Sequence, residues 1–130
     1  MSLEENKALA RVWLEAVMNR HDLDAIDRAY APDYLYRGPA GMEVRGREKA
    51  RAIAASLIDA VPDRVATVDF QMAGGDRVVT RWTSRGTNTG PLFGAPPTGG
   101  PFLAEGIVIS RIEDGRILED FEINHITTEA

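Results

Sequence analysis

The spacing of the hydrophobic residues changes near residue 62, and this change restricts the folds open to the chain. Up to Val61 the apolar residues recur at intervals of three and four, which is typical of amphipathic helices. From Val65 onward they alternate with polar residues at an interval of two, which is typical of half-buried strands. Helices that precede a run of antiparallel strands predict an α+β domain, with the helices packed on one face of the sheet.

Local signals divide the first half into three helices. Ser2 and Glu5 have the spacing of a capping box and mark the start of the first helix. Asp22 is expected to cap a short second helix that Pro32 ends. The expected elements are a helix over about 3–20, the short helix after Asp22, a strand over 34–36, a turn over 38–41 and a helix over about 47–60.

The second half predicts an antiparallel meander. Its expected strands cover residues 65–72, 77–90, 102–112 and 116–126. The segment 91–100, PLFGAPPTGG, holds three prolines and three glycines, so we expect a stiff loop there. A long curved sheet folded over helices encloses a cone, and the inward faces of its strands should line a cavity.

Composition excludes several classes of protein. The 130 residues, at 14.2 kDa, fit one domain over 1–130. A net charge of -5 argues against a nucleic-acid partner, and no apolar run is long enough for a membrane helix. The absence of cysteine removes disulfides and thiolate chemistry. The acidic N-terminal segment lacks the features of a secretory signal, which predicts a cytoplasmic location.

The last strand carries the most titratable groups. Residues two apart share a face of a strand. One row consists of Ile117, Glu119, Phe121, Ile123 and His125. Because this row is the more apolar one, we expect it to face the interior. Asp120 and Glu122 belong to the other row and are expected on a solvated or subunit-facing surface.

His125 and Glu105 are the candidate catalytic residues. A neutral imidazole can take a proton from an activated carbon and return it, although a histidine near a chain end can also make only a hydrogen bond. Glu105 shares a face with the apolar residues of 102–112, where a carboxylate would have a raised pKa. The alternative for Glu105 is an arginine partner or a position at a sheet edge.

Substrate contacts are expected from aromatic and amide side chains. The candidates are Asn88, Trp82, Trp13, Tyr30, Tyr34, Glu119 and Phe121. The Asn88 amide could hold a substrate carbonyl, as amides do in oxyanion sites. The aromatic residues form a cavity wall on this interpretation, and simple core packing is the alternative. His21 and His125 lie in different elements, and no glycine-rich phosphate loop occurs, so neither a metal nor a cofactor is expected.

The chain resembles a known family in three stretches. They are NRHDLDAIDRAYAPDY at 19–34, GDRVVTRWTSRGTNTGPLFGAPPTGG at 75–100 and ISRIEDGRILEDFEINH at 109–125. These stretches resemble the SnoaL-like polyketide cyclases, within the nuclear-transport-factor-2-like superfamily. The resemblance implies a cone-shaped α+β fold, with N-terminal helices packed on a curved, mostly antiparallel sheet, and a pocket for a hydrophobic small molecule.

The resemblance also bears on individual positions. The family pattern E-x-W-x-x-x-D, whose aspartate lies near the pocket, aligns with Glu119, Phe121 and His125. Asn88 stands where many members have a histidine in the pattern GTH. A homodimer is common in the superfamily, and the outer sheet face with Val79, Arg81, Thr83 and Arg85 suits a second subunit.

Two functions follow from these observations. The first is a cofactor-independent cyclase or isomerase that performs acid-base chemistry on a ketone-bearing hydrophobic substrate, by aldol closure or enolisation. The second is a non-catalytic protein that binds a hydrophobic small ligand, or a dimeric interaction module.

Overall fold

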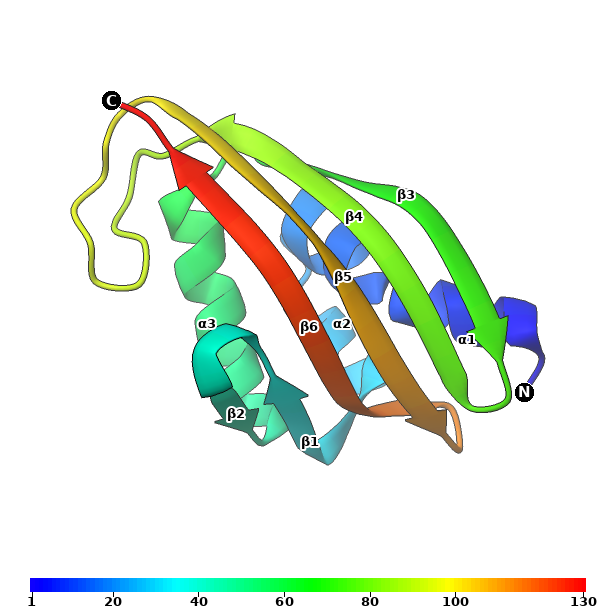
Figure 1. Cartoon of the computed structure of the whole chain (residues 1–130). Helices are drawn as coiled ribbons and strands as arrows, with labels where there is room; N and C mark the ends of the chain where they lie inside the picture. Colours follow the sequence, from blue (N-terminus) through cyan, green and yellow to red (C-terminus); the bar gives the residue numbers. More distant parts are fainter.

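A six-stranded sheet curves around a layer of helices in the computed structural model, which describes residues 1–130 (Figure 1). The strand order is β2-β1-β6-β5-β4-β3, and β1 is parallel to β6 while the other neighbours are antiparallel. The strands are β1 (Tyr30–Arg37), β2 (Glu43–Arg45), β3 (Val65–Gly74), β4 (Arg77–Thr87), β5 (Pro101–Glu113) and β6 (Arg116–Thr128). The predicted α+β class with a curved, mostly antiparallel sheet is confirmed.

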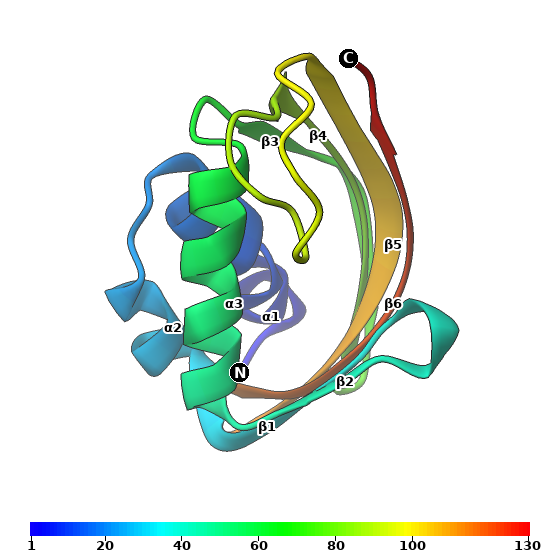
Figure 2. The same ribbon diagram turned by 90° about the vertical axis from the view of Figure 1, so that its left-hand side faces the viewer.

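The helices lie together on the concave side of the sheet (Figure 2). They are α1 (Leu3–Ala10), the π-helix η1 (Trp13–Asn19), α2 (Asp24–Ala29) and α3 (Arg47–Ala60). The 3-10 turn η2 (Pro39–Gly41) lies apart from them, in the connection between β1 and β2. No helix has the length and apolar character that crossing a membrane requires. The loop 91–100 extends from β4 into the space between α3 and the sheet before it joins β5.

Most of the predicted elements are confirmed, with differences in the first half. The capping box of Ser2 and Glu5 is present, and the third helix covers the predicted 47–60. Asp22 does not cap the second helix; its carboxylate accepts a hydrogen bond from Arg28 at 2.8 Å instead. That helix ends before Pro32, because the chain has already entered β1 at Tyr30. The short strand β2 was not predicted.

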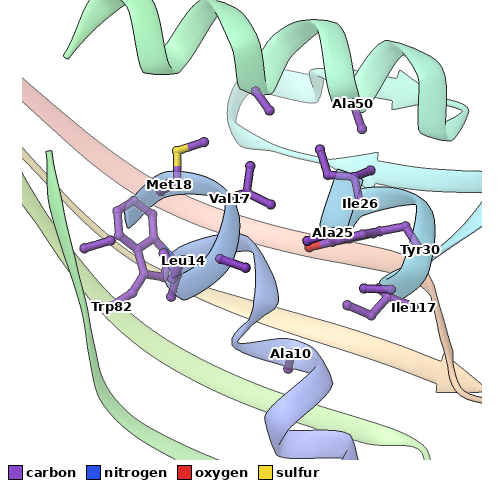
Figure 3. Packing of buried hydrophobic residues seen from close by; sticks show 14 of the residues in the cluster. Ala10, Leu14, Val17, Met18, Ala25, Ile26, Tyr30, Ala50, Trp82 and Ile117 are labelled. Carbon is purple, nitrogen blue, oxygen red and sulfur yellow. The ribbon is translucent and has the colours of Figure 1, made fainter. Parts of the chain in front are cut away.

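The core lies between the helices and the inner sheet face. Trp82 on β4 packs beside Leu14 and Met18 of η1, while Tyr30 and Ile117 meet on the other side of the cluster (Figure 3). Tyr30 also joins an aromatic row. Its ring lies edge-on to Trp13 with 6.1 Å between centroids, and edge-on to Tyr34 at 4.7 Å. This row lines one side of the interior.

A β-bulge reverses the two faces of β6. Ile112 pairs with Ile117 and Arg111 with Glu119, so Leu118 has no partner on β5. One extra residue in a strand shifts every later side chain to the opposite face. Ile117 therefore points inward, as predicted, but the next buried side chain is that of Asp120. Phe121 is 49% exposed and Ile123 is 66% exposed.

Replacing Ile26 with alanine should destabilise the fold by about 2–5 kcal/mol. Ile26 lies on α2 and is fully buried in the core, so the truncation removes packing contacts and leaves a cavity. The free energy of unfolding in urea measures the effect. Val65→Ala is the matched control, since Val65 is 63% exposed and its truncation should change stability by less than about 0.5 kcal/mol. Equal losses in the two variants would contradict this account of the core.

Candidate active site

A cavity of about 330 Å³ lies between the helices and the inner face of the sheet. Its wall is mainly apolar, since 19 of the 26 residues that line it are hydrophobic. The polar side chains of the wall gather in two places. One group comes from β1, β5 and β6 and contains two carboxylates, and the other contains Arg64 and Ser84. Such an apolar pocket with a few convergent polar groups is typical of a small-molecule site.

Asp120 is the central residue of the first group. Its Oδ2 accepts a hydrogen bond from the Tyr34 hydroxyl at 2.6 Å, and its Oδ1 accepts one from the Ser110 hydroxyl at 2.6 Å. Three strands supply these groups, because β6 lies between β1 and β5. Each carboxylate oxygen has a second lone pair, so Asp120 can still accept a proton while both donors hold it in place.

Burial raises the pKa of Asp120 from 3.8 to about 6. Removing a carboxylate from water disfavours its charged form. The hydrogen bonds from Ser110 and Tyr34 act in the opposite direction, and the nearby charge of Glu122 raises the pKa further. At pH 7 Asp120 is thus mostly ionised yet close to its pKa, which is the condition that suits a general base.

Glu122 forms a second acidic group on the same face of β6. It accepts hydrogen bonds from Tyr36 at 2.6 Å, from the Trp82 indole at 2.8 Å and from the Asn124 amide at 3.1 Å. Burial raises its pKa, although these three donors lower it. Glu122 is more fully engaged than Asp120, so its carboxylate anchors the polar wall of the cavity.

The tyrosines around these acids remain neutral hydrogen-bond donors. Burial raises the pKa of Tyr30, Tyr34 and Tyr36, and the charges of Asp120 and Glu122 raise them further. Tyr34 and Tyr36 donate to the two carboxylates. The Tyr30 hydroxyl makes no hydrogen bond within the protein, and Figure 3 shows its oxygen directed toward the interior. A free phenolic donor therefore lies in the wall near Asp120.

The prediction that Glu105 and His125 face the cavity is wrong. They are neighbours across β5 and β6, but both lie on the outer face of the sheet, where Arg81 pairs with Glu105 at 3.4 Å. Glu119 and Phe121 also lie outside the cavity. On β6 the cause is the bulge at Leu118. On β5 the cause is that both faces carry apolar residues, so alternation does not show which face points inward.

Apart from Phe121, the aromatic candidates lie where they were expected. Trp13, Tyr30, Tyr34 and Trp82 all line the cavity, and their contact with a substrate stays a prediction. Asn88 is buried but does not line the cavity. Its amide donates to the carbonyl of Gly90 at 2.9 Å and accepts from the Thr98 amide at 3.0 Å. Asn88 therefore fixes the base of the 91–100 loop, whose Leu92 and Phe93 contribute to the wall.

Sequence reasoning missed Asp120, Glu122 and Ser110 as members of the site. No residue type near Leu118 predicts a bulge there. Without the bulge, alternation along β6 would place Asp120 in the outward row. One usable signal was present: Tyr34 and Tyr36 are two apart on a strand and so share a face. Buried tyrosine hydroxyls usually have partners, and for Tyr34 and Tyr36 the acceptors are carboxylates.

The chain belongs to the SnoaL-like polyketide cyclase family, whose model matches residues 8–125. This stretch includes every residue of the cavity described above except Ile126. No curated protein sequence matches the chain.

Solved structures agree with this assignment. IdmH from Streptomyces antibioticus, a candidate polyketide cyclase, is 31% identical, with 92% of this chain and 91% of that one covered and a TM-score of 0.77. AclR from Streptomyces galilaeus, a candidate hydroxylase, is 29% identical, with 97% and 77% covered and a TM-score of 0.79. A candidate SnoaL-like cyclase from Jannaschia sp. CCS1 is 21% identical, covers 93% and 85%, and reaches a TM-score of 0.84, which supports the fold.

Asp120→Asn should remove a pH dependence of stability. The folded protein binds the Asp120 proton more tightly than the unfolded chain, so this group stabilises the fold fully below about pH 4 and loses its contribution as pH rises through about 6. The shift from 3.8 to about 6 corresponds to about 3 kcal/mol. The stability of Asp120→Asn relative to wild type should therefore increase by about this amount between about pH 4 and about pH 8.

Urea unfolding at a series of pH values measures this difference. Asp33→Asn is the control, because it makes the same substitution at an exposed position of the same sheet. A difference for Asp120→Asn that does not change across this range would contradict the buried, raised-pKa carboxylate.

Proposed function

We propose that the chain is a cofactor-independent enzyme that moves protons on a ketone-bearing hydrophobic small molecule, by enolisation or aldol closure. The observation that carries the proposal is Asp120, an ionisable carboxylate held by Tyr34 and Ser110 in the wall of an apolar cavity, with its pKa raised to about 6. Membership of the SnoaL-like polyketide cyclase family and the similarity to IdmH support the same reaction class.

The proposed reaction begins with proton removal by Asp120. Its carboxylate takes a proton from the carbon next to the substrate ketone, and the electron pair of that C–H bond moves to the carbonyl oxygen to form an enolate. The Tyr30 hydroxyl is free to donate a hydrogen bond to this oxygen. Fixed donors that meet developing negative charge are among the largest contributions to catalysis.

The proton that Asp120 takes is returned within the same cycle. In an enolisation it goes to the enolate oxygen, and in an aldol closure it goes to the oxygen of the second carbonyl after the new carbon–carbon bond has formed. Asp120 ends in the state in which it began. The apolar wall favours this sequence, because it binds the hydrocarbon part of the substrate and keeps water from the enolate.

Asp120→Asn should lower catalysed proton exchange by about 10²–10⁴-fold, the usual contribution of a general base. The assay is deuterium incorporation in D2O next to the carbonyl of hydrophobic ketones, such as acetylnaphthalene and steroid ketones, followed by NMR. Because the base acts in its ionised form, the wild-type rate should rise as pH increases through about 6.

His125→Ala and Glu105→Gln are the controls, because both side chains lie on the outer sheet face. Each should keep its exchange rate within about twofold of wild type, a difference small on the scale of a lost catalytic group. If these ketones bind but exchange no faster than in buffer, the cavity belongs to a binding protein instead. Loss of exchange in His125→Ala would contradict the proposal and indicate that His125 is catalytic.

We also propose a homodimer formed through the outer face of the sheet. Ile107, Ile109, Phe121 and Ile123 lie next to one another on β5 and β6 and are between 37% and 66% exposed. Arg81 and Glu105 border this patch with opposite charges. A two-fold interface buries the same patch of both subunits, so mixed charge around an apolar centre makes the surface complementary to itself.

Ile123→Glu should convert the dimer into a monomer, because two carboxylates would be buried at the proposed interface without partners. Sedimentation velocity measures the change. Leu3→Glu is the control, since Leu3 is also exposed but begins α1 on the helical side. A wild type that sediments as a monomer contradicts the proposed dimer.

A further inference from the structure

Arg64 is the only charged side chain in the cavity wall outside the acidic group of β6. It precedes β3 and is only 8% exposed. One terminal nitrogen donates to the Ser84 hydroxyl at 3.1 Å, and the other donates to the Leu57 carbonyl at 3.1 Å. The guanidinium also lies over the Phe102 ring, 4.8 Å from its centroid. These contacts fix its position in the wall.

No carboxylate of the protein pairs with Arg64. It makes no direct ion pair: the charge of the neighbouring Asp63 acts on it, but the Asp63 carboxylate accepts its hydrogen bonds from Thr87. The Nε of Arg64 is buried without a hydrogen-bond partner. The Leu57 carbonyl belongs to the last turn of α3, so the helix end compensates the charge in part. Burial lowers the pKa of Arg64 to about 10, which leaves the group charged at neutral pH. A buried cation without an anion is unfavourable unless another molecule supplies one.

Ser84 adds a second unused donor. It is 1% exposed and lines the same part of the cavity, where its oxygen accepts the hydrogen bond from Arg64. The hydroxyl proton makes no hydrogen bond within the protein. Arg64 has five N–H groups, and the protein uses two of them. This end of the cavity therefore offers donors, whereas the end at Asp120 and Glu122 offers acceptors.

The geometry points to Arg64 and Ser84 as an anchoring subsite for a carboxylate of the substrate. An arginine and a hydroxyl side by side match the two oxygens of that group, and the guanidinium gains a direct ion pair, which the protein does not provide. Ser84 pairs with Ala104 and Asp120 with Ser110, six residues further along β5, so the two ends lie about 20 Å apart along the strand.

This inference rests on the proposed function, because it adds a feature to the substrate of the same cavity. A molecule that reaches both ends has a ketone near Asp120 and a carboxylate at Arg64, with a hydrocarbon segment between them against the apolar wall. The substrate class is therefore a hydrophobic keto acid. The carboxylate also sets the direction of binding, since Asp120 and Glu122 repel it from their end.

The test compares two probes with the same hydrocarbon chain and ketone, of which only one carries a negative charge. One is an oxoundecanoic acid whose ketone lies next to the terminal methyl group, and the other is its methyl ester. Calorimetric titration at about pH 8 should show the acid binding wild type at least about tenfold more tightly, a preference of about 1.4 kcal/mol. Arg64→Gln should abolish this preference while the affinity for the ester stays nearly unchanged.

Three further variants control the interpretation. Arg85→Gln removes the same charge from an exposed arginine and should keep the preference. Arg64→Lys keeps the charge without the forked geometry and should keep only part of it. Ser84→Ala should reduce it several-fold, and this variant decides the question if Arg64→Gln does not fold. Equal affinities of acid and ester for wild type, no binding of the acid up to its solubility, or a preference that survives in the Arg64 and Ser84 variants would overturn the subsite.

The same probe separates this inference from the proposed function. Deuterium exchange next to its ketone reports on Asp120, while the preference for acid over ester reports on Arg64. If exchange depends on Asp120 but the acid binds no better than the ester, the catalytic proposal stands and the Arg64 subsite is wrong. A preference that depends on Arg64, with no exchange in wild type, keeps the subsite and contradicts the catalytic proposal.

Discussion

The unpaired residue Leu118 determines which chemistry the cavity contains. Without this bulge, the alternation of β6 would turn Glu119 and His125 inward and place Asp120 on the outside. With it, Asp120 reaches the hydroxyls of Tyr34 on β1 and Ser110 on β5, and Glu122 reaches Tyr36 and Trp82. Bulges recur beside active sites because they redirect a side chain at little cost to the sheet. A single extra residue thus exchanges Glu119 and His125 for Asp120 and Glu122 on the inner face.

The neighbouring strands explain why Asp120 can remain in so apolar a place. Burying a carboxylate is unfavourable unless hydrogen bonds satisfy it. Tyr34 and Ser110 supply one donor to each oxygen, and the parallel pairing of β1 with β6 brings the tyrosine to the position it needs. Two donors are enough to hold the group but too few to cancel the cost of burial, so its pKa stays raised. Burial of the Asp120 carboxylate therefore both destabilises the folded protein and enables this group to accept a proton.

The fold was largely predictable from the sequence, and the site was not. The helical period up to Val61, the alternation beyond Val65 and the turn residues at 113–115 define the elements, because each depends on local spacing. The inward orientation of Trp82 and Ser84 on β4 also followed from alternation, since the other row of that strand is polar. On β5 both rows are apolar, and on β6 the bulge interrupts the alternation. On these two strands the direction of each side chain depends on how the strands pair. The spacing of residues within one strand does not reveal that pairing.

The apolar outer face and the polar inner wall belong to one arrangement. In an ordinary half-buried sheet the apolar row marks the interior, but in β6 beyond the bulge the more apolar row, with Phe121 and Ile123, is the exposed one. The inner row carries Ser110, Asp120, Glu122 and Asn124 because it faces a cavity rather than packed core. A sheet with an exposed hydrophobic patch on its outer face gains stability when a second molecule covers that patch. In β6 the polar row therefore faces the cavity and the apolar row faces outward, which is why alternation of apolar residues predicted the wrong inner face.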